Sequence, residues 1–175
     1  MKIHATAQGP FIQGYNAQAA VSTEGPTLIV GAQVVQDTND RRQLIPTLEA
    51  IPGALGQPDI VLADSGYDHG GQIEQLRQRG TRVYCPPQNV GLKPPSNLER
   101  RRVWQQRVMR RQELNQPDIQ NLYRRRAATS EPCFHVIKRV MGFARFSLRG
   151  LSGVNLEWDL VSLAYNCRKL APVFA

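Results

Sequence analysis

Cysteine, acidic residues and long apolar runs are scarce in this 175-residue sequence, and each scarcity argues against a class of protein. Its three cysteines are scattered and form no CxxC pair, which disfavours a disulfide framework or a zinc site and fits a reducing cytoplasm. No apolar run approaches the roughly 20 residues of a membrane-spanning helix, and the N-terminus lacks a signal-peptide core. We therefore expect a cytoplasmic protein with no membrane partner.

The shortage of acid leaves a strong positive charge. Lysine and arginine number 22 against 14 aspartate and glutamate residues, for a formal net charge of +8. Such an imbalance indicates a polyanionic partner, with nucleic acid as the leading candidate. The length suits a single domain that is large enough to bury a core.

One stretch organises the expected fold, and it runs from Ile60 to Gly71. Four apolar residues, Ile60 to Ala63, lead directly into Asp64, and Ser65 and Gly66 then break the run. A short apolar run between turn residues predicts a strand buried on both faces. Asp64 would lie at its carboxyl end, where open α/β sheets place their ligands.

The flanking segments predict an α/β fold with a mixed sheet. Phe11–Val21 and Thr27–Gln36 are expected to pair as a hairpin, because Glu24-Gly25-Pro26 is a turn signal. After Asp64, a helix over His69–Arg79 and a strand over Arg82–Pro86 complete a strand–helix–strand unit. Its two strands should therefore be parallel.

Three further aspartates have simple structural explanations. Asp37 and Asp40 precede an expected short helix over Arg41–Ala50 and are predicted to cap it. Asp68 and His69 could lie near a metal site, but a turn and helix-cap role is the better interpretation for Asp68.

An arginine-rich segment covers about residues 96–126. Between Glu99 and Arg126 there are nine arginines and only three acids. A solvated charged helix is the simple interpretation of such a run, but the excess of one sign favours contact with phosphate. The arginines are Arg100, Arg101, Arg102, Arg107, Arg110, Arg111, Arg124, Arg125 and Arg126.

Two more helices are expected near the C-terminus. Ser130-Glu131-Pro132 predicts the start of a helix over Glu131–Arg145. Glu131, His135 and Lys138 would share one face of it and could address a metal and a phosphate, or form an ordinary surface stripe. The last helix has an apolar stripe that we expect to pack against the core, as we do for Trp104 and Trp158. The stripe consists of Leu156, Leu160, Leu163, Cys167 and Leu170.

Four segments carry a resemblance to a known family. They are GYNAQAAV (Gly14 to Val21), VLADSGYDHGGQIEQLRQRG (Val61 to Gly80), EPCFHVIKRVMGFARFSLRG (Glu131 to Gly150) and LEWDLVSLAYNCRKL (Leu156 to Leu170). Their order and spacing resemble the C-terminal part of a bacterial insertion-sequence transposase, in the IS1182-like branch of the IS4/IS5 DDE superfamily.

The resemblance implies roles for particular residues. Asp64 corresponds to the second catalytic acid and Glu131 to the third, and both would bind Mg²⁺ or Mn²⁺. Lys138 corresponds to the lysine that follows the third acid and would serve both catalysis and DNA contact. The remaining DNA-binding positions implied are Tyr123, Arg124, Arg125 and Arg126.

The family's first catalytic aspartate precedes the GYNAQ segment, and Met1–Pro10 contains no acidic residue. We therefore expect residues 1–175 to be a partial DDE catalytic domain with an arginine-rich helical insertion at about 96–126. The expected fold is a ribonuclease-H-like mixed sheet that lacks its first, central strand. Asp37 and Asp40, placed in a loop, are not expected to replace the missing acid.

The implied function is DNA transposition by metal-dependent strand cleavage and strand transfer, with little activity from this chain alone. Its expected partners are double-stranded DNA at insertion-sequence ends and targets, a second copy on DNA, and an upstream fragment supplying the first aspartate. Two alternatives remain: a non-catalytic DNA-binding remnant, and a small α/β protein with an unrelated role, such as binding a small molecule.

Overall fold

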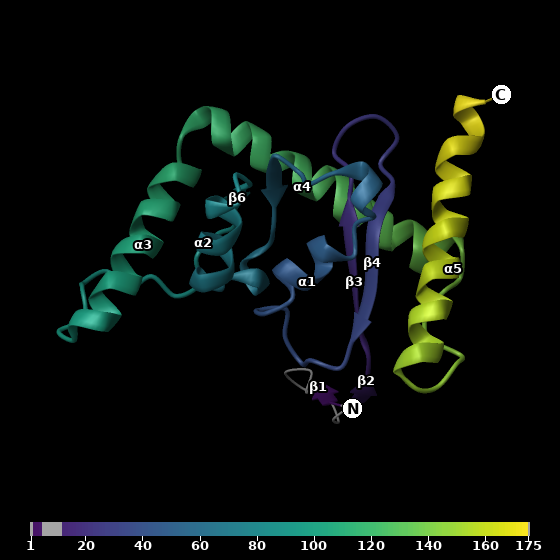
Figure 1. Ribbon diagram of the computed structural model, residues 1–175, viewed down its shortest axis with the longest axis horizontal. Helices are drawn as coiled ribbons and strands as arrows, with labels where there is room; N and C mark the ends of the chain where they lie inside the picture. The colour runs from purple at the N-terminus through teal and green to yellow at the C-terminus, as the bar shows by residue number, and fades with distance from the viewer. Residues whose placement is uncertain (1, 5–11, 175) are drawn as a thin grey trace.

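The strands of the protein occur in pairs (Figure 1). The computed structural model describes residues 2–4 and 12–174. Its strands are β1 (Lys2–His4), β2 (Ile12–Gly14), β3 (Asn16–Val21), β4 (Ile29–Val35), β5 (Ile60–Leu62) and β6 (Arg82–Tyr84). β1–β2 and β3–β4 are antiparallel, whereas β5–β6 is parallel. Within the described residues no strand joins these pairs into one sheet.

The predicted hairpin is confirmed as β3–β4. Gly25 adopts a positive φ of 64° in the connecting turn, a conformation that favours glycine. The N-terminal segment was only partly anticipated. β1 was not predicted, β2 is separate from β3, and the predicted strand start at Phe11 lies outside the described residues.

The strand–helix–strand unit around Asp64 is also confirmed, but the strand predicted to be buried on both faces is only half-buried at each of its three residues. α2 (Gly70–Gln78) connects β5 to β6 and buries Ile73 and Leu76. The N-cap of α2 is His69 rather than Asp68, since His69 Nδ1 accepts a hydrogen bond from the backbone N–H of Gln72. The carboxyl ends of both strands thus lie at the same edge of this parallel pair.

Helices make up most of the remaining chain. They are α1 (Leu44–Glu49), α3 (Leu98–Leu114), α4 (Pro117–His135) and α5 (Leu151–Leu170). Short 3-10 segments are η1 (Gly53–Leu55), η2 (Ser65–Tyr67) and η4 (Ala171–Val173), and η3 (Val136–Val140) is a π-helix. No helix among residues 2–4 and 12–174 is long and apolar enough to cross a membrane.

The predicted helix start at Glu131 is wrong. α4 begins at Pro117, which occupies its first position with Asp118 in the first turn, and it continues past Glu131 to His135. Pro132 therefore lies inside the helix, and the π-helix η3 follows directly. The true start signal was Pro117-Asp118, inside the arginine-rich segment, where the excess of charge obscured the helix boundary.

Two apolar cores organise the packing. The first joins β3–β4 to the end of α4 and to α5, and Trp158 at its centre packs among Phe134, Phe143 and Phe146. The packing role expected of Trp158 is confirmed. The second core lies among α1, α2, β5 and β6 and includes Ala63, next to Asp64. Figure 1 places α3 and α5 at opposite ends of the long axis.

The stripe of α5 that was predicted to pack faces outward instead. Leu156, Leu160 and Leu163 are 58%, 59% and 58% exposed. The buried face contains Val154, Trp158, Ser162 and Tyr165.

Two polar residues set the orientation of α5. Asn155 bonds through its side chain to both the N–H and the C=O of Val34, and Asn166 does the same at Ile29. Eleven helical residues span about 16 Å and five strand residues about 17 Å, so both asparagines fit one edge of β4. Leucine content alone therefore identified the wrong face.

Candidate active site

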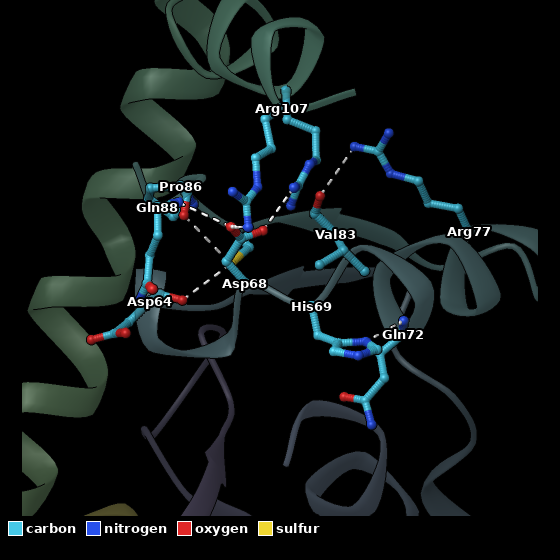
Figure 2. A network of polar contacts seen from close by, with 11 residues as sticks. Asp64, Asp68, His69, Gln72, Arg77, Val83, Pro86, Gln88 and Arg107 are labelled. Atoms are coloured by element: carbon cyan, nitrogen blue, oxygen red, sulfur yellow. Dashed lines mark hydrogen bonds and ion pairs between the residues drawn. The ribbon is translucent and has the colours of Figure 1, made fainter. Parts of the chain in front are cut away.

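Asp64 follows β5 directly, and its carboxylate is exposed at the carboxyl end of the strand. The side chain also caps η2 by accepting a hydrogen bond from the backbone N–H of Gly66. Figure 2 shows the Asp64 carboxylate pointing away from Asp68. Asp64 is therefore held in place by the turn while its carboxylate remains open to solvent.

Helix α4 brings three of the predicted residues toward this strand end. The hydroxyl of Tyr123 donates to the carbonyl of Ala63 at 2.9 Å. The guanidinium of Arg126 lies 5.7 Å from the centre of the Tyr123 ring and 3.4 Å from Oε1 of Glu131. A chain of contacts thus runs from the residue before Asp64 to Glu131. The carboxylate of Glu131 is itself exposed.

Burial is the main cause of the raised pKa of Tyr123, and the Asp64 charge also contributes. The neighbouring Arg126 guanidinium acts in the opposite direction and lowers it. The phenol therefore remains a hydrogen-bond donor at neutral pH, which maintains the contact between α4 and β5.

Asp40 comes close to Asp64, which the sequence did not predict. Its Oδ1 accepts hydrogen bonds from Asn16 at 2.6 Å and from Gln18 at 2.7 Å. A Cβ added at Gly66 would lie 2.9 Å from Oδ1 of Asp64 and 3.4 Å from Oδ2 of Asp40. The two carboxylates therefore flank one glycine. Asn16 and Gln18 in the GYNAQ segment gave no local indication of this partner.

The capping role predicted for Asp37 and Asp40 is wrong. The N-cap of α1 is Gln43, which makes no side-chain cap bond. Asp37 instead accepts from Gln43 Nε2 at 2.6 Å, and Asp40 is occupied by β3. Asp37 thus contacts the side chain of the N-cap residue rather than a backbone N–H of α1, and the partners of Asp40 lie 22 and 24 positions earlier in the chain.

Tyr67 connects the turn after Asp64 to the hairpin by donating its hydroxyl proton to Gln18 on β3. Burial raises the pKa of this phenol most, and the charges of Asp40 and Asp64 raise it further. Burial, helped by the charge of Asp68, likewise raises the pKa of Cys85 to about 12, and its thiol contacts the backbone oxygen of Asp64. Both protonated groups hold the Asp64 turn in place.

Asp68 is the centre of a buried ion cluster rather than a helix cap (Figure 2). It is 2% exposed, and its oxygens lie 3.1 Å from Arg107 and 2.7 Å from Arg110. The backbone N–H of Gln88 also donates to it at 3.0 Å. The prediction that Asp68 caps a helix is wrong. Its true partners lie about forty positions further along the chain, where the local sequence around Asp68 gives no sign of them. Two of the nine arginines are thereby engaged in holding α3.

The other predicted DNA-contact residues have mixed surroundings. Arg124 is exposed and lies near Asn121, and Arg125 is exposed and donates to the carbonyl of Thr23 at 2.7 Å. Lys138 is exposed in the π-helix, with its ammonium group 6.0 Å from the centre of the Phe134 ring. Trp104, predicted to pack, is half-buried and donates its indole N–H to Gly91. The exposed cations are available to a polyanion.

Within the part of the chain that the structure describes, no three His, Cys, Asp or Glu side chains gather closely enough to hold a metal ion. The available donors are carboxylate oxygens, which suit hard divalent cations. Asp64 and Glu131 thus fit Mg²⁺ in ligand type, but two carboxylates supply only part of a coordination shell.

Comparison with known proteins gives one clear result. The family described as the transposase DDE domain matches residues 2–167, nearly the whole chain. No curated protein and no solved structure matches the chain significantly. A match of this extent shows that the chain belongs to the transposase DDE domain family.

Proposed function

We propose that the chain is the C-terminal part of an insertion-sequence transposase of the IS1182-like branch, acting on double-stranded DNA by strand cleavage and strand transfer. Asp64 and Glu131 are its catalytic carboxylates, and Lys138 assists at the DNA. The observation that supports this most is the contact chain from Ala63 through Tyr123 and Arg126 to Glu131. Through these contacts, side chains of α4 link the strand end that carries Asp64 to Glu131, which lies 67 positions later in the sequence.

The proposed metal ligands are Asp64 and Glu131, with Mg²⁺ or Mn²⁺ as the ion. Family members generally depend on a divalent metal. A bound divalent ion supplies charge stabilisation to the entering and leaving oxygens of an in-line phosphoryl transfer. The residues of this chain hold the site: the Gly66 N–H orients Asp64, while Arg126 orients Glu131.

We further propose a ribonuclease-H-like sheet whose central strand carries the first catalytic aspartate and comes from an upstream fragment. Among the described residues β3 pairs only with β4, and β5 only with β6. α5 covers the edge of β4 that faces away from β3. A further strand could therefore pair at the edge of β3 that faces away from β4. Tyr67, in the turn that follows β5, bonds to Gln18 on β3. This contact is consistent with β3 and β5 being neighbouring strands of one sheet.

DNA contact is assigned to Tyr123, Arg124, Arg125, Arg126 and Lys138. Arg124, Arg125 and Lys138 are exposed, which suits contact with backbone phosphates. Two copies of the chain would act together on DNA, one at each end of the element. Binding through Z phosphates should weaken with a log–log salt slope of about −0.9Z.

A nicking assay on DNA carrying the element's terminal repeats tests the proposal. We expect little cleavage in Mg²⁺ from the purified chain alone, and cleavage when a fragment supplying an Asp-bearing strand is added. Robust cleavage by the chain alone would contradict the missing-acid interpretation. Failure with every upstream fragment of the parent element would contradict the proposed catalytic role.

Metal binding separates this proposal from a non-catalytic DNA-binding remnant. Arg126 contacts only one oxygen of Glu131, so a metal ion at Glu131 would compete with the arginine for that oxygen, and in a remnant the ion pair would be all that the carboxylate makes. Calorimetric Mg²⁺ binding should weaken in Asp64→Ala and Glu131→Ala. The matched control is Glu74→Ala, an exposed acid on α2. Unchanged binding in all three variants would support the remnant.

A further inference from the structure

Gly66 lies between two carboxylates, and its missing side chain leaves a space between them. A Cβ built at Gly66 would lie 2.9 Å from Oδ1 of Asp64 and 3.4 Å from Oδ2 of Asp40. The backbone does not require glycine at this position, because Gly66 does not have a positive φ. A side chain here would therefore disturb the pair of acids rather than the turn.

The two oxygens are close enough for one divalent ion to bind both. Their distances to the Gly66 Cβ position limit their separation to about 6 Å, and two oxygens that share a Mg²⁺ ion lie at most about 4 Å apart. The largest adjustment needed is thus about 2 Å, which a rotation of the exposed Asp64 side chain can supply.

Hydrogen bonds fix one oxygen of Asp40 and leave the other available. Oδ1 accepts from Asn16 at 2.6 Å and from Gln18 at 2.7 Å. Gln18 is 2% exposed, so this side of the carboxylate is anchored in the interior. Oδ2 accepts no hydrogen bond from the described residues, and it is the oxygen on the side of Gly66. Asp40 therefore presents a positioned, unshared oxygen to the space beside Gly66.

No basic side chain neutralises either acid within residues 2–4 and 12–174. Asp68, only four residues after Asp64, contrasts with them because it contacts two arginines. Burial is the largest cause of the raised pKa of Tyr67, but the charges of Asp40 and Asp64 raise it further, so both act on one phenol. Two unpaired carboxylates this close repel each other, and a cation held between them would remove the repulsion.

We propose that Asp40 is a further ligand of the divalent ion, which it shares with Asp64 in the space beside Gly66. This rests on the proposed function, in which Asp64 and Glu131 bind Mg²⁺ or Mn²⁺. Asp40 contributes a carboxylate oxygen, the type of donor that both ions prefer. It adds to the aspartate expected from an upstream fragment and does not replace it, since the proposal concerns metal binding and not cleavage by the chain alone.

Mn²⁺ binding to the purified chain tests this assignment without DNA. Free Mn²⁺ gives an electron paramagnetic resonance signal that is lost on binding, so a titration yields the dissociation constant. Asp40→Asn keeps an oxygen that can accept from Asn16 and Gln18 but replaces the available oxygen by an amide nitrogen. It should weaken binding at least about tenfold, because the site loses one charged ligand.

The matched control for this titration is Asp37→Asn, which changes another acid of the same loop. It should bind Mn²⁺ within about twofold of the native chain, because Asp37 is not assigned to the ion. Equal binding by the two variants, or a native chain that binds no Mn²⁺, would overturn the proposal.

Asp64→Ala in the same titration separates this proposal from the proposed function. We expect it to weaken binding at least as much as Asp40→Asn does. Loss of binding in Asp64→Ala with native binding in Asp40→Asn would remove Asp40 from the site and leave the proposed function standing. Native binding in Asp64→Ala would overturn both.

Gly66→Ala tests where the ion lies. The added Cβ would occupy the space between the two carboxylates, so Mn²⁺ binding should weaken at least about tenfold while the circular dichroism spectrum remains native. The control is Gly53→Ala, where a Cβ would meet nothing within 4 Å, and it should bind as the native chain does. A folded Gly66→Ala variant with native Mn²⁺ affinity would contradict the proposed position.

Discussion

The two long helices at the ends of the molecule, α3 and α5, are held by opposite means. α3 buries only one residue, Arg110, and is fixed by its ion pair with Asp68. α5 buries Val154, Trp158 and Tyr165 in the main core and adds amide contacts to β4. The buried contacts of α3 are thus ionic, with the Glu113–Arg77 ion pair and the Trp104–Gly91 hydrogen bond at its surface, whereas those of α5 are mainly apolar.

This contrast makes α3 and α5 dependent on different chemistry. Stability at α5 should respond to lost volume, because its contacts are apolar and close-packed. At α3 it should respond to lost charge, because removing one member of a buried ion cluster leaves its partners uncompensated. The four substitutions below test this contrast, in order of decreasing expected effect.

Trp158→Ala should give the largest loss, about 4 kcal/mol of the free energy of unfolding. The side chain is 2% exposed, packs among three phenylalanines and donates its indole N–H to Gln18. Denaturant unfolding followed by circular dichroism measures the effect. A loss below about 1 kcal/mol would mean that α5 is not held chiefly by its core face.

Asp68→Asn should cost about 3 kcal/mol, because Arg107 and Arg110 would lose the carboxylate that compensates their charge. Hydrogen exchange should show faster opening of α3 than of α5. The control is Glu113→Ala on the same helix, where the ion pair with Arg77 is more than a third exposed and should contribute less than about 1 kcal/mol. Equal losses in the two variants would contradict an anchoring role for Asp68.

Asn155→Ala should cost about 1.5 kcal/mol, since it leaves the N–H and C=O of Val34 without their side-chain partner. Exchange of the Val34 amide should accelerate, while amides of β5 and β6 remain protected. If the Val34 amide remained equally protected, the edge contact would not hold α5 to the hairpin.

Arg101→Ala should have the smallest effect, under about 0.5 kcal/mol, because this side chain on α3 is exposed and unengaged in any described ion pair. The same variant should reduce the salt dependence of DNA binding by about one unit of slope, if Arg101 contacts a phosphate. Fluorescence anisotropy over a salt series provides the measurement. An unchanged slope would exclude that contact.

Local sequence patterns predicted the parts of the fold that depend on near neighbours. The apolar run before Asp64 predicted a strand, and the helical spacing after it predicted the connection to β6. The hairpin followed from its turn residues in the same way. Membership of a transposase family also followed from segment order and agrees with the family match.

The failed predictions involve polar contacts between distant residues. Asp68 pairs with an arginine 42 positions away, and Asn155 with a residue 121 positions away. Hydrophobic periodicity and helix-cap patterns describe only near neighbours and contain no information about such partners. They therefore predict a core role for the leucines of α5 and a helix-cap role for Asp68. The closeness of Asp40 to Asp64 was missed for the same reason, because it depends on contacts with β3.

The asparagines of α5 have one more consequence. An exposed strand edge is a template on which further chains can add, and this is a common route to aggregation. Asn155 and Asn166 present amide groups to β4 much as another strand would, but no further strand can add beyond the helix that carries them. A further strand can therefore pair with the hairpin only at β3. The β3–β4 sheet can grow in one direction and not in both.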